Sequence, residues 1–485
     1  MLTLRTTGYR AGHALRSPGW VWAAVSMAIA LATLGRQALS WDEAITDGAA
    51  ERSLPRLAGL LGHTDVPLAL YYLLMHGWLW IAHTMRIPAD EVWLRLPSVA
   101  GAALTVGGVC WLAEHWYGRR EAWVAGGLAS VAPMLTFYAQ DARPYALAVA
   151  AVVVSVVVLV HACEAPSARL VLRYTACVVA AVALQMFAAF ALLAHVLYVP
   201  RSQRRAFVPA WLLALTVTAA IGWLGHRQVS EIGWIPPLSL IGASHVLVHL
   251  AGGIGVTVGL ALVAGLISRQ GRRPSRTTVF LLAWATTPPV LLIVGATVTP
   301  DLVARYAIST VPAVAILLGR AAVRGTHTVR LFVAATLVAA AVASSVQAIA
   351  PYKYEDYRAA ADAIGDSGAR GASLVFLPSS GRAGFAPYAT LESDLAPLAD
   401  AALAPGGSPV LTTRIDGLDA APATVSARLA RYRTLYLVGD TLATARRSLR
   451  SATDRSEEAA LAGLTAVAVR RFGEVTVTEF RRRAT

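Results

Sequence analysis

The stretch Trp41-Asp42-Glu43-Ala44 decides how the rest of the chain is interpreted. It follows the first long apolar run, about residues 20–34, and no charged residue occurs in that run or after it until Arg36. A carboxylate pair in this place is expected where a membrane helix emerges into water. Charged groups close to lipid are costly and usually mark a functional site. We therefore interpret the remainder of the chain as a scaffold for this pair.

The composition is that of a membrane protein with a soluble tail. Of 485 residues, 56% are hydrophobic and 14% are charged, whereas soluble domains carry about 25% charged residues. The mean hydropathy is +0.56. Residues 1–350 contain repeated apolar runs of the length that crosses a bilayer, and residues 351–485 are mixed and polar. We predict an α-helical polytopic domain, 1–350, followed by a small α/β domain, 351–485.

The formal net charge of +14 is carried almost wholly by arginine, because Lys353 is the only lysine. A basic balance can indicate nucleic-acid binding, but these arginines lie in loops between apolar runs, as the positive-inside rule expects. Seventeen of them fall in the predicted inner segments. We therefore predict a multi-pass protein of the cytoplasmic membrane that binds no nucleic acid, with its N-terminus in the cytoplasm and its C-terminal domain outside.

Eleven spans fit this charge pattern. The predicted spans are residues 20–34, 93–114, 122–138, 146–163, the two halves of 174–200 divided near Gln185, 207–224, 243–267, 278–299, 306–319 and 331–350. The first run has no small-residue cleavage site and is expected to be retained as a helix. Residues 66–80 are also apolar, but a span there would place Arg119 and Arg120 outside, so we interpret them as an interfacial helix within the first outer loop, 39–92.

The tail alternates helical and strand patterns. The predicted helices are 357–364, 426–432 and 441–451, and the predicted strands are 373–377, 434–438 and 474–480. No catalytic motif is recognised in it.

Three groups on the predicted outer face carry candidate chemistry. The first is Asp42 with Glu43, the second is Gln140-Asp141-Ala142-Arg143, and the third is Arg305-Tyr306. A carboxylate can serve as general base toward an acceptor hydroxyl in glycosyl transfer. A guanidinium forks onto phosphate oxygens and stays charged. One base with phosphate-binding arginines favours direct displacement and inversion. A retaining route needs a second carboxylate, and the adjacent Glu43 points elsewhere.

Structural explanations compete with each assignment. Asp42 and Glu43 could cap the helix that follows, with Asp at the N-cap and Glu in the first turn. Asp141 and Arg143 could form a structural ion pair at the mouth of a helix. Arg305 and Tyr306 could anchor the chain at the membrane interface.

No cofactor is assigned from the sequence. The histidines make no convincing metal set, and the three cysteines lie inside apolar runs without CxxC spacing. A divalent metal ion is compatible with the carboxylates but not required by them.

Five motifs in order resemble the GT-C superfamily, and within it the group of protein O-mannosyltransferases, aminoarabinose transferases and bacterial relatives. The motifs are Trp41-Asp42-Glu43-Ala44, Asp65-Val66-Pro67-Leu68 leading into Tyr71-Tyr72, Leu94-Arg95-Leu96-Pro97-Ser98, Tyr117-Gly118-Arg119-Arg120, and Tyr138-Ala139-Gln140-Asp141-Ala142-Arg143-Pro144-Tyr145. They cover about residues 18–200, with weaker matches at Arg305-Tyr306 and Glu355-Asp356-Tyr357-Arg358.

The resemblance implies a GT-C fold with juxtamembrane helices in the first outer loop, and an inverting transfer from a polyprenyl-phosphate-linked sugar to an extracytoplasmic glycan, lipid or protein. The family's first-loop aspartate maps onto Asp42. Relatives often have two prolines preceded by His or Lys where this chain has Asp65-Val66-Pro67-Leu68, so a phosphate-contacting lysine is missing and Arg143 or Arg305 is expected to replace it. The Arg- and Ala-rich composition is compatible with a GC-rich bacterium such as an actinobacterium, and in that case the resemblance favours decaprenyl-phosphate mannose or arabinose as the donor.

The predicted site therefore combines two catalytic and eight substrate-binding residues. The catalytic residues are Asp42 and Glu43, and the substrate-binding residues are Asp65, Tyr138, Gln140, Asp141, Arg143, Tyr145, Arg305 and Tyr306.

Two other classes of function remain open at this stage. A transporter or flippase of lipid-linked sugar would need polar or broken helices near the membrane midplane, often in repeated halves, and no internal repeat is seen. An inactive scaffold that binds cell-wall glycan would keep the same motifs.

Overall fold

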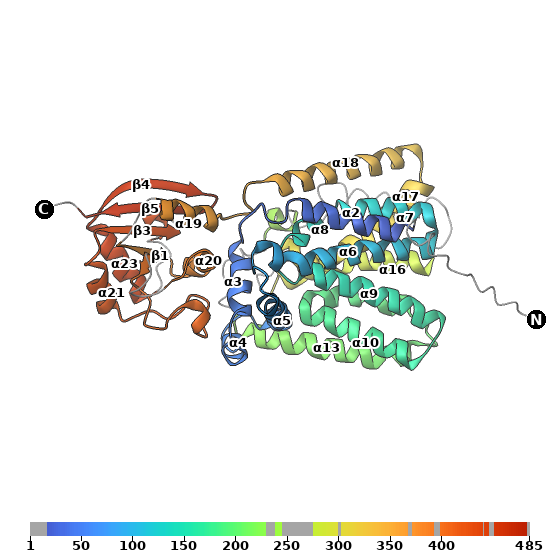
Figure 1. The fold of residues 1–485 in the computed structure, drawn as a ribbon. Helices are drawn as coiled ribbons and strands as arrows, with labels where there is room; N and C mark the ends of the chain where they lie inside the picture. Colours follow the sequence, from blue (N-terminus) through green and yellow to red (C-terminus); the bar gives the residue numbers. More distant parts are fainter. Residues whose placement is uncertain are drawn as a thin grey trace, which may run out of the picture. The chain divides into compact units, whose positions relative to one another are not determined.

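The computed structural model describes residues 17–228, 238–244, 275–298, 302–366, 371–391, 398–439, 441–445 and 451–482 (Figure 1). The chain divides into two compact units. Unit 1 comprises Met1–Thr33 and Arg95–Ala348, and unit 2 comprises Leu34–Leu94 and Ile349–Thr485. Leu34–Leu94, which we had assigned to the domain 1–350, thus belongs to the same unit as the C-terminal residues.

Unit 1 is helical (Figure 1). Its described helices, two of which extend past the unit boundaries, are α2 (Pro18–Ala32), α6 (Glu91–Tyr117), α7 (Arg119–Ser130), α8 (Pro133–Ala139), α9 (Tyr145–Glu164), α10 (Ala168–Leu184), η2 (Met186–Ala188), α11 (Ala189–Leu192), α12 (His195–Tyr198), α13 (Arg204–His226), α16 (Arg276–Gly295), η4 (Ala304–Thr310), α17 (Val311–Arg324) and α18 (His327–Ile349). Within the described residues, six helices are long and apolar enough to cross a membrane, or seven if the bent pair α7–α8 is one span. Apolar helices of this length support a membrane protein.

The structure does not confirm eleven spans. The predicted span 122–138 is divided into α7 and α8, which are bent by 58° at a break before Pro133. Proline cannot donate a hydrogen bond within a helix and suits a first helical position, so it begins α8. The predicted break near Gln185 is observed, because α10 ends at Leu184, but only short helices follow it. Most of the predicted span 243–267 lies outside the described residues.

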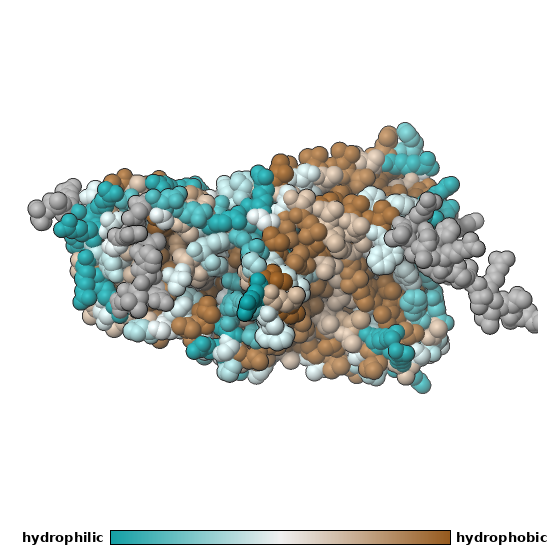
Figure 2. All heavy atoms as spheres, in the orientation of Figure 1, coloured by the Kyte–Doolittle hydropathy of each residue, from teal (hydrophilic) through white to brown (hydrophobic). Residues whose placement is uncertain are grey.

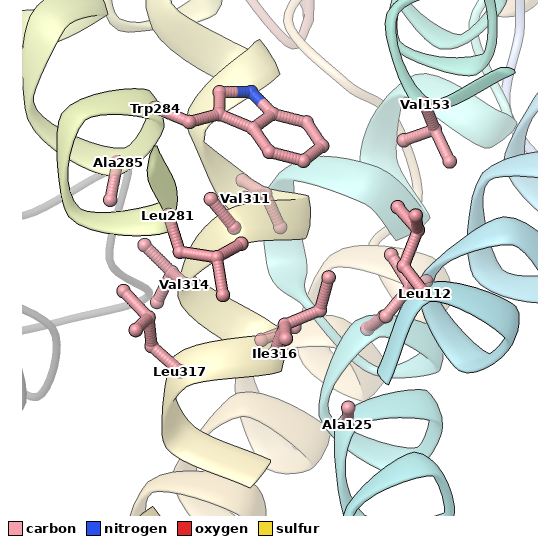
Figure 3. Packing of buried hydrophobic residues seen from close by; sticks show 14 of the residues in the cluster. Leu112, Ala125, Val153, Leu281, Trp284, Ala285, Val311, Val314, Ile316 and Leu317 are labelled. Atoms are coloured by element: carbon pink, nitrogen blue, oxygen red, sulfur yellow. The ribbon is translucent and has the colours of Figure 1, made fainter. Parts of the chain in front are cut away.

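The main core of unit 1 is formed by α6, α7, α9, α16 and α17. Figure 3 shows Leu281 and Trp284 of α16 facing Val311 and Ile316 of α17. Two helices present most of their apolar surface outward. Only 17% of the apolar 18-residue segment of α13 is buried, and 22% of that of α18. Hydrophobic side chains accordingly dominate the visible surface over the helices of unit 1 (Figure 2). Such surface is expected to face lipid.

Unit 2 combines four short helical elements from the first loop with an α/β domain. The loop elements are α3 (Trp41–Ala50), α4 (Leu54–Leu61), η1 (Val66–Leu68) and α5 (Ala69–Met85). The domain elements are α19 (Tyr357–Asp366), β1 (Ala372–Leu377), α20 (Gly381–Phe385), η5 (Ala386–Tyr388), β2 (Leu398–Asp400), η6 (Pro409–Leu411), α21 (Pro422–Leu429), β3 (Thr434–Gly439), α22 (Leu442–Ala445), α23 (Ala452–Ala462), β4 (Thr465–Phe472) and β5 (Val475–Arg481).

The five strands form one mixed sheet in the order β2-β1-β3-β5-β4. The strand β1 pairs in parallel with β2 and β3, whereas β5 pairs antiparallel with β3 and β4. Alternate residues of β1 serve two cores, because Leu374 and Phe376 lie in one buried cluster while Val375 and Leu377 lie in another. This alternation is what a sheet covered on both faces requires.

The sequence located the central strands of this sheet and missed its edges. Strands predicted at 373–377, 434–438 and 474–480 and a helix at 357–364 correspond to β1, β3, β5 and α19. The strands β2 and β4 and the helix α23 were not predicted. The predicted helix 426–432 lies in part within α21, and the predicted helix 441–451 lies partly outside the described residues.

Candidate active site

The helix that carries Asp42 begins with a reciprocal capping motif. Ser40 is the N-cap, its hydroxyl accepts from the backbone N–H of Glu43, and the Glu43 carboxylate accepts from the backbone N–H of Ser40 at 3.0 Å. A Ser-x-x-Glu sequence satisfies two otherwise unpaired helix donors in this way. The capping explanation raised from the sequence therefore applies to Glu43, whereas the N-cap itself is Ser40 and not Asp42.

Glu43 is fully buried, and its carboxylate also contacts a cation. The Lys353 ammonium donates to Glu43 Oε2 at 2.9 Å, and the exposed fractions of the two side chains are 1% and 0%. The oxygen that caps α3 is thus also the oxygen that binds the lysine. Lys353 follows α18 and belongs to the same unit as α3.

Further contacts from the C-terminal residues hold the segment that leads into α3. The backbone N–H of Leu39 donates to the Tyr388 hydroxyl at 2.7 Å, and that of Trp41 donates to Glu355 Oε2 at 3.4 Å. The Trp41 indole N–H donates to the carbonyl of Ser380 at 3.0 Å. The start of the helix is therefore held by three residues of the domain, Tyr388, Glu355 and Ser380.

Asp42 lies in the first turn of α3 and is half-buried. Its carbonyl accepts from the Thr46 hydroxyl at 3.2 Å. The N-terminal end of a helix carries partial positive charge, which favours acidic side chains in the first turn. Asp42 is thus a partly accessible carboxylate at this end of α3.

The opposite end of α3 is held by a buried arginine. Arg52, 2% exposed, donates to the carbonyls of Thr412, Pro409 and Gly48. Burial lowers its pKa to about 10. Both ends of α3 are thus held by contacts with the C-terminal domain.

A second acid of α3 lines a small cavity. Asp47 of α3 and Arg52, which follows the helix, line about 40 Å³ together with Ala383, Pro409 and other residues of the domain. Burial raises the pKa of Asp47 to about 7, and the neighbouring carboxylates of Glu51 and Glu91 add to this effect. Asp47 therefore titrates near neutral pH, which the sequence did not indicate.

Asp65 lies at the start of η1 and adopts a left-handed backbone conformation, with φ of 57°. Its Oδ2 accepts from the Tyr72 hydroxyl at 2.7 Å. Tyr72 is fully buried, so the contact ties the loop to α5. A non-glycine residue at positive φ is uncommon and is typical of turns and functional loops.

The remaining predicted site residues lie in unit 1, on the turn between α8 and α9 and on η4. Ser98 of α6 donates through its hydroxyl to the carbonyl of Asp141 at 2.6 Å. Arg143 N–H donates to the same carbonyl at 2.8 Å, which closes the turn. Gln140 is bonded through its side chain to the Thr33 hydroxyl at 3.0 Å. Asp141 and Arg143 are 4% and 7% exposed.

Four predicted residues form one cluster of rings around a guanidinium. The rings of Tyr138 and Tyr145 are 4.6 Å apart, and Arg305 Cζ lies 5.8 Å from the centroids of both Tyr145 and Tyr306. Tyr306 in turn stacks on Phe187 at 4.6 Å. Arg305 comes from η4, more than 150 residues from Tyr145, so only the fold brings these side chains together. Arginine over aromatic faces is a stable arrangement.

The structure thus places Asp42, Glu43 and Asp65 in unit 2 and the seven other predicted residues in unit 1. The sequence missed the residues that hold α3, namely Lys353, Tyr388 and Arg52. One signal was present, because Lys353 is the only lysine of the chain. No group of three or more metal-ligating side chains occurs among the described residues.

Comparison with known proteins shows similarity in the fold and not in the sequence. No family model matches the chain, and no curated protein matches it. The crystal structure of ArnT from Cupriavidus metallidurans in the apo state matches with a TM-score of 0.58 and 12% identity, over 95% of this chain and 98% of that chain. The structure of the same protein bound to undecaprenyl phosphate matches with a TM-score of 0.56 and 12% identity, over 97% and 98%. At 12% identity these matches show that this chain shares the fold of ArnT, which agrees with the fold that the resemblance predicted.

Proposed function

We propose that this chain is an inverting glycosyltransferase that moves a sugar from a polyprenyl-phosphate-linked donor to an acceptor outside the cytoplasmic membrane. The observation that carries the proposal is the match to ArnT over nearly the whole length of both chains, including the form of ArnT that is bound to undecaprenyl phosphate. Mannose and arabinose are the sugars that we would test first.

In the proposed reaction Asp42 is the general base. Its carboxylate accepts the proton of an acceptor hydroxyl, and the hydroxyl oxygen attacks the anomeric carbon. The bond from that carbon to the phosphate oxygen breaks, and polyprenyl phosphate leaves with the bonding electrons. A single base with direct displacement inverts the configuration. The position of Asp42 in the first turn of α3 supports this role.

The arginines are proposed to bind the phosphate. Arg305 lies among the rings of Tyr145 and Tyr306, which orient its planar guanidinium. Arg143 lies on a turn that Ser98 holds. A guanidinium offers paired donors to phosphate oxygens and stabilises the charge that develops on a leaving phosphate. The remaining predicted residues, Asp65, Tyr138, Gln140, Asp141 and Tyr306, are proposed to orient the donor and the acceptor.

The test is release of polyprenyl phosphate by the purified full chain from polyprenyl-phosphate mannose and polyprenyl-phosphate arabinose, with a membrane glycolipid extract as acceptor. Asp42→Asn is compared with wild type and with Asp362→Asn, which changes an exposed aspartate of α19 in the same unit. We expect loss of turnover only in Asp42→Asn, with donor binding retained.

Other outcomes contradict the proposal in different ways. Full turnover in Asp42→Asn assigns the base to another residue. Movement of labelled lipid across proteoliposomes without conversion indicates a transporter. Glycan binding without release of polyprenyl phosphate from either donor indicates a scaffold.

A further inference from the structure

Lys353 is buried in a place where an ammonium group is costly. The chain has one lysine among 485 residues, and its side chain is 1% exposed. Removing an ammonium from water is strongly unfavourable unless it is paired. The pairing group, Glu43 Oε2, is 2.9 Å away and belongs to the residue directly after Asp42. The lysine thus acts on the helix turn that carries the proposed base.

One oxygen of Glu43 accepts two hydrogen bonds at the start of α3. Glu43 Oε2 accepts from the backbone N–H of Ser40 at 3.0 Å and from Lys353. A capping box alone needs only the backbone donors, so the lysine is an additional constraint on the rotation of the first turn. Asp42 lies two residues after Ser40 and directly before Glu43 in the same turn, so fixing the cap fixes the backbone from which its carboxylate projects.

We propose that Lys353 is a positioning residue for Asp42, which it orients through Glu43 at the N-terminal end of α3. This inference rests on the function proposed above. The C-terminal domain then contributes to catalysis by holding the first loop, since Lys353, Glu355 and Tyr388 all contact the residues around Ser40. Displacement of a catalytic group by about 1 Å can lower a rate by about 100-fold.

The single lysine allows a test that does not depend on activity. The full chain in lipid nanodiscs is treated with an amine-acetylating ester, and acetylation of the Lys353 peptide is followed by mass spectrometry. We expect Lys353 to react at least about 10-fold more slowly in wild type than in Glu43→Gln, because the buried pair shields it. Glu457→Gln, the same substitution at another fully buried glutamate of the same unit, is the control and should react like wild type. Equal rates in wild type and Glu43→Gln would refute the buried pair.

A second readout reports on the helix turn itself. Hydrogen–deuterium exchange of peptides covering residues 38–47 should become faster in Lys353→Met and remain close to wild type in Lys353→Arg, which keeps a cation. Unchanged exchange in Lys353→Met would show that the lysine does not hold this turn. Neither this measurement nor the labelling requires a correct donor, so they separate failure of this inference from failure of the proposed function.

The kinetic test separates positioning from simple stabilisation. We expect kcat to fall about 10- to 100-fold in Lys353→Met with KM for the donor unchanged. The double variant Glu43→Gln/Lys353→Met removes both charges, and replacement of both partners of a buried pair often restores stability. If Lys353 positions Asp42, the double variant regains thermal stability and stays slow. If it regains full kcat as well, the pair is only structural and the inference is wrong.

Discussion

The start of α3 in unit 2 and the cluster around Arg305 in unit 1 are both candidate parts of an active site, and they are held by different forces. At α3 the contacts are charged or strongly polar and buried, as in the pair of Glu43 with Lys353. At Arg305 the guanidinium lies over the rings of Tyr145 and Tyr306, and Phe187 stacks on Tyr306. A buried charge pair fails when one partner is removed, whereas packed rings lose their contacts gradually. Substitutions in the two regions should therefore differ in size and in kind.

The largest effect is expected at Asp42. Asp42→Asn removes the proposed proton acceptor without changing the size of the side chain, and a general base contributes about 10²- to 10⁴-fold. We expect a loss of kcat in that range with an unchanged thermal unfolding temperature, measured by polyprenyl phosphate release and by thermal unfolding in detergent. If Asp42→Asn lowered the unfolding temperature as much as Lys353→Met does, Asp42 would stabilise the fold as the buried pair does. The distinction between a catalytic Asp42 and a supporting Glu43–Lys353 pair would then be wrong.

Arg382 tests how strongly buried charge holds unit 2. Its guanidinium, 0% exposed, lies 2.6 Å from Asp400 and 3.0 Å from Asp419. Arg382→Met would leave these carboxylates without their cation, and breaking a buried pair on one side costs about 3–5 kcal/mol. We expect the unfolding temperature of the variant to fall by several degrees. Arg414→Met, at a largely exposed arginine that pairs with Asp416 at 3.5 Å, is the control and should change it little.

Arg305 tests the ring cluster of unit 1. Arg305→Lys keeps the charge but loses the planar fork and its stacking on Tyr145 and Tyr306. We expect KM for the donor to rise about 10-fold with a smaller change in kcat, measured by donor titration of polyprenyl phosphate release. Arg227→Lys changes an equivalent arginine–ring contact, over Trp223 of α13 and outside the cluster, and should have no effect. Equal effects of the two substitutions would remove the case for a phosphate site at Arg305.

The smallest effect is expected at Asp47 and depends on pH. Burial raises its pKa from 3.8 to about 7, so the folded protein binds a proton that the unfolded chain releases. Protonated Asp47 therefore makes its full contribution to the free energy of unfolding below about pH 4, and this contribution is lost as the pH rises to about 7. Asp47→Asn should be more stable than wild type at pH 8 by about 1–2 kcal/mol, after allowance for partial exposure, and this difference should shrink toward pH 4.

Thermal unfolding of Asp47→Asn and wild type at pH 5 and pH 8 measures this difference. A difference that is the same at both pH values would show that Asp47 is ionised in the folded protein as in the unfolded one.

Much of the local structure followed from the sequence because its causes are local. Ser40 and Glu43 are three residues apart, and that spacing is enough for a helix start, although we considered only Asp42 as the N-cap. Pro133 breaks the predicted span 122–138 by its own geometry, and the sequence contained that signal although we did not use it. The strands β1, β3 and β5 were found because they are apolar or alternating, while β4 was missed because most of its residues are exposed.

The candidate site was predictable only in its parts. Asp42, Gln140, Arg143 and Arg305 were selected as polar residues beside apolar runs. The approach of Arg305 to Tyr145 could not be derived, because it depends on how η4 packs against α9. The partners of α3 could not be derived either, since Lys353 is 310 residues from Glu43 in the chain.

The sequence by itself determined a helical chain with repeated apolar spans, a soluble α/β tail, and a capped helix that carries Asp42. These features depend on composition, hydrophobic period and residues within one turn of each other. The tertiary structure alone decided that the first loop packs with the C-terminal domain and that one buried lysine joins them. The physical reason is that a buried charge is stable only beside its partner, and which partner it meets depends on contacts between segments that are distant along the chain.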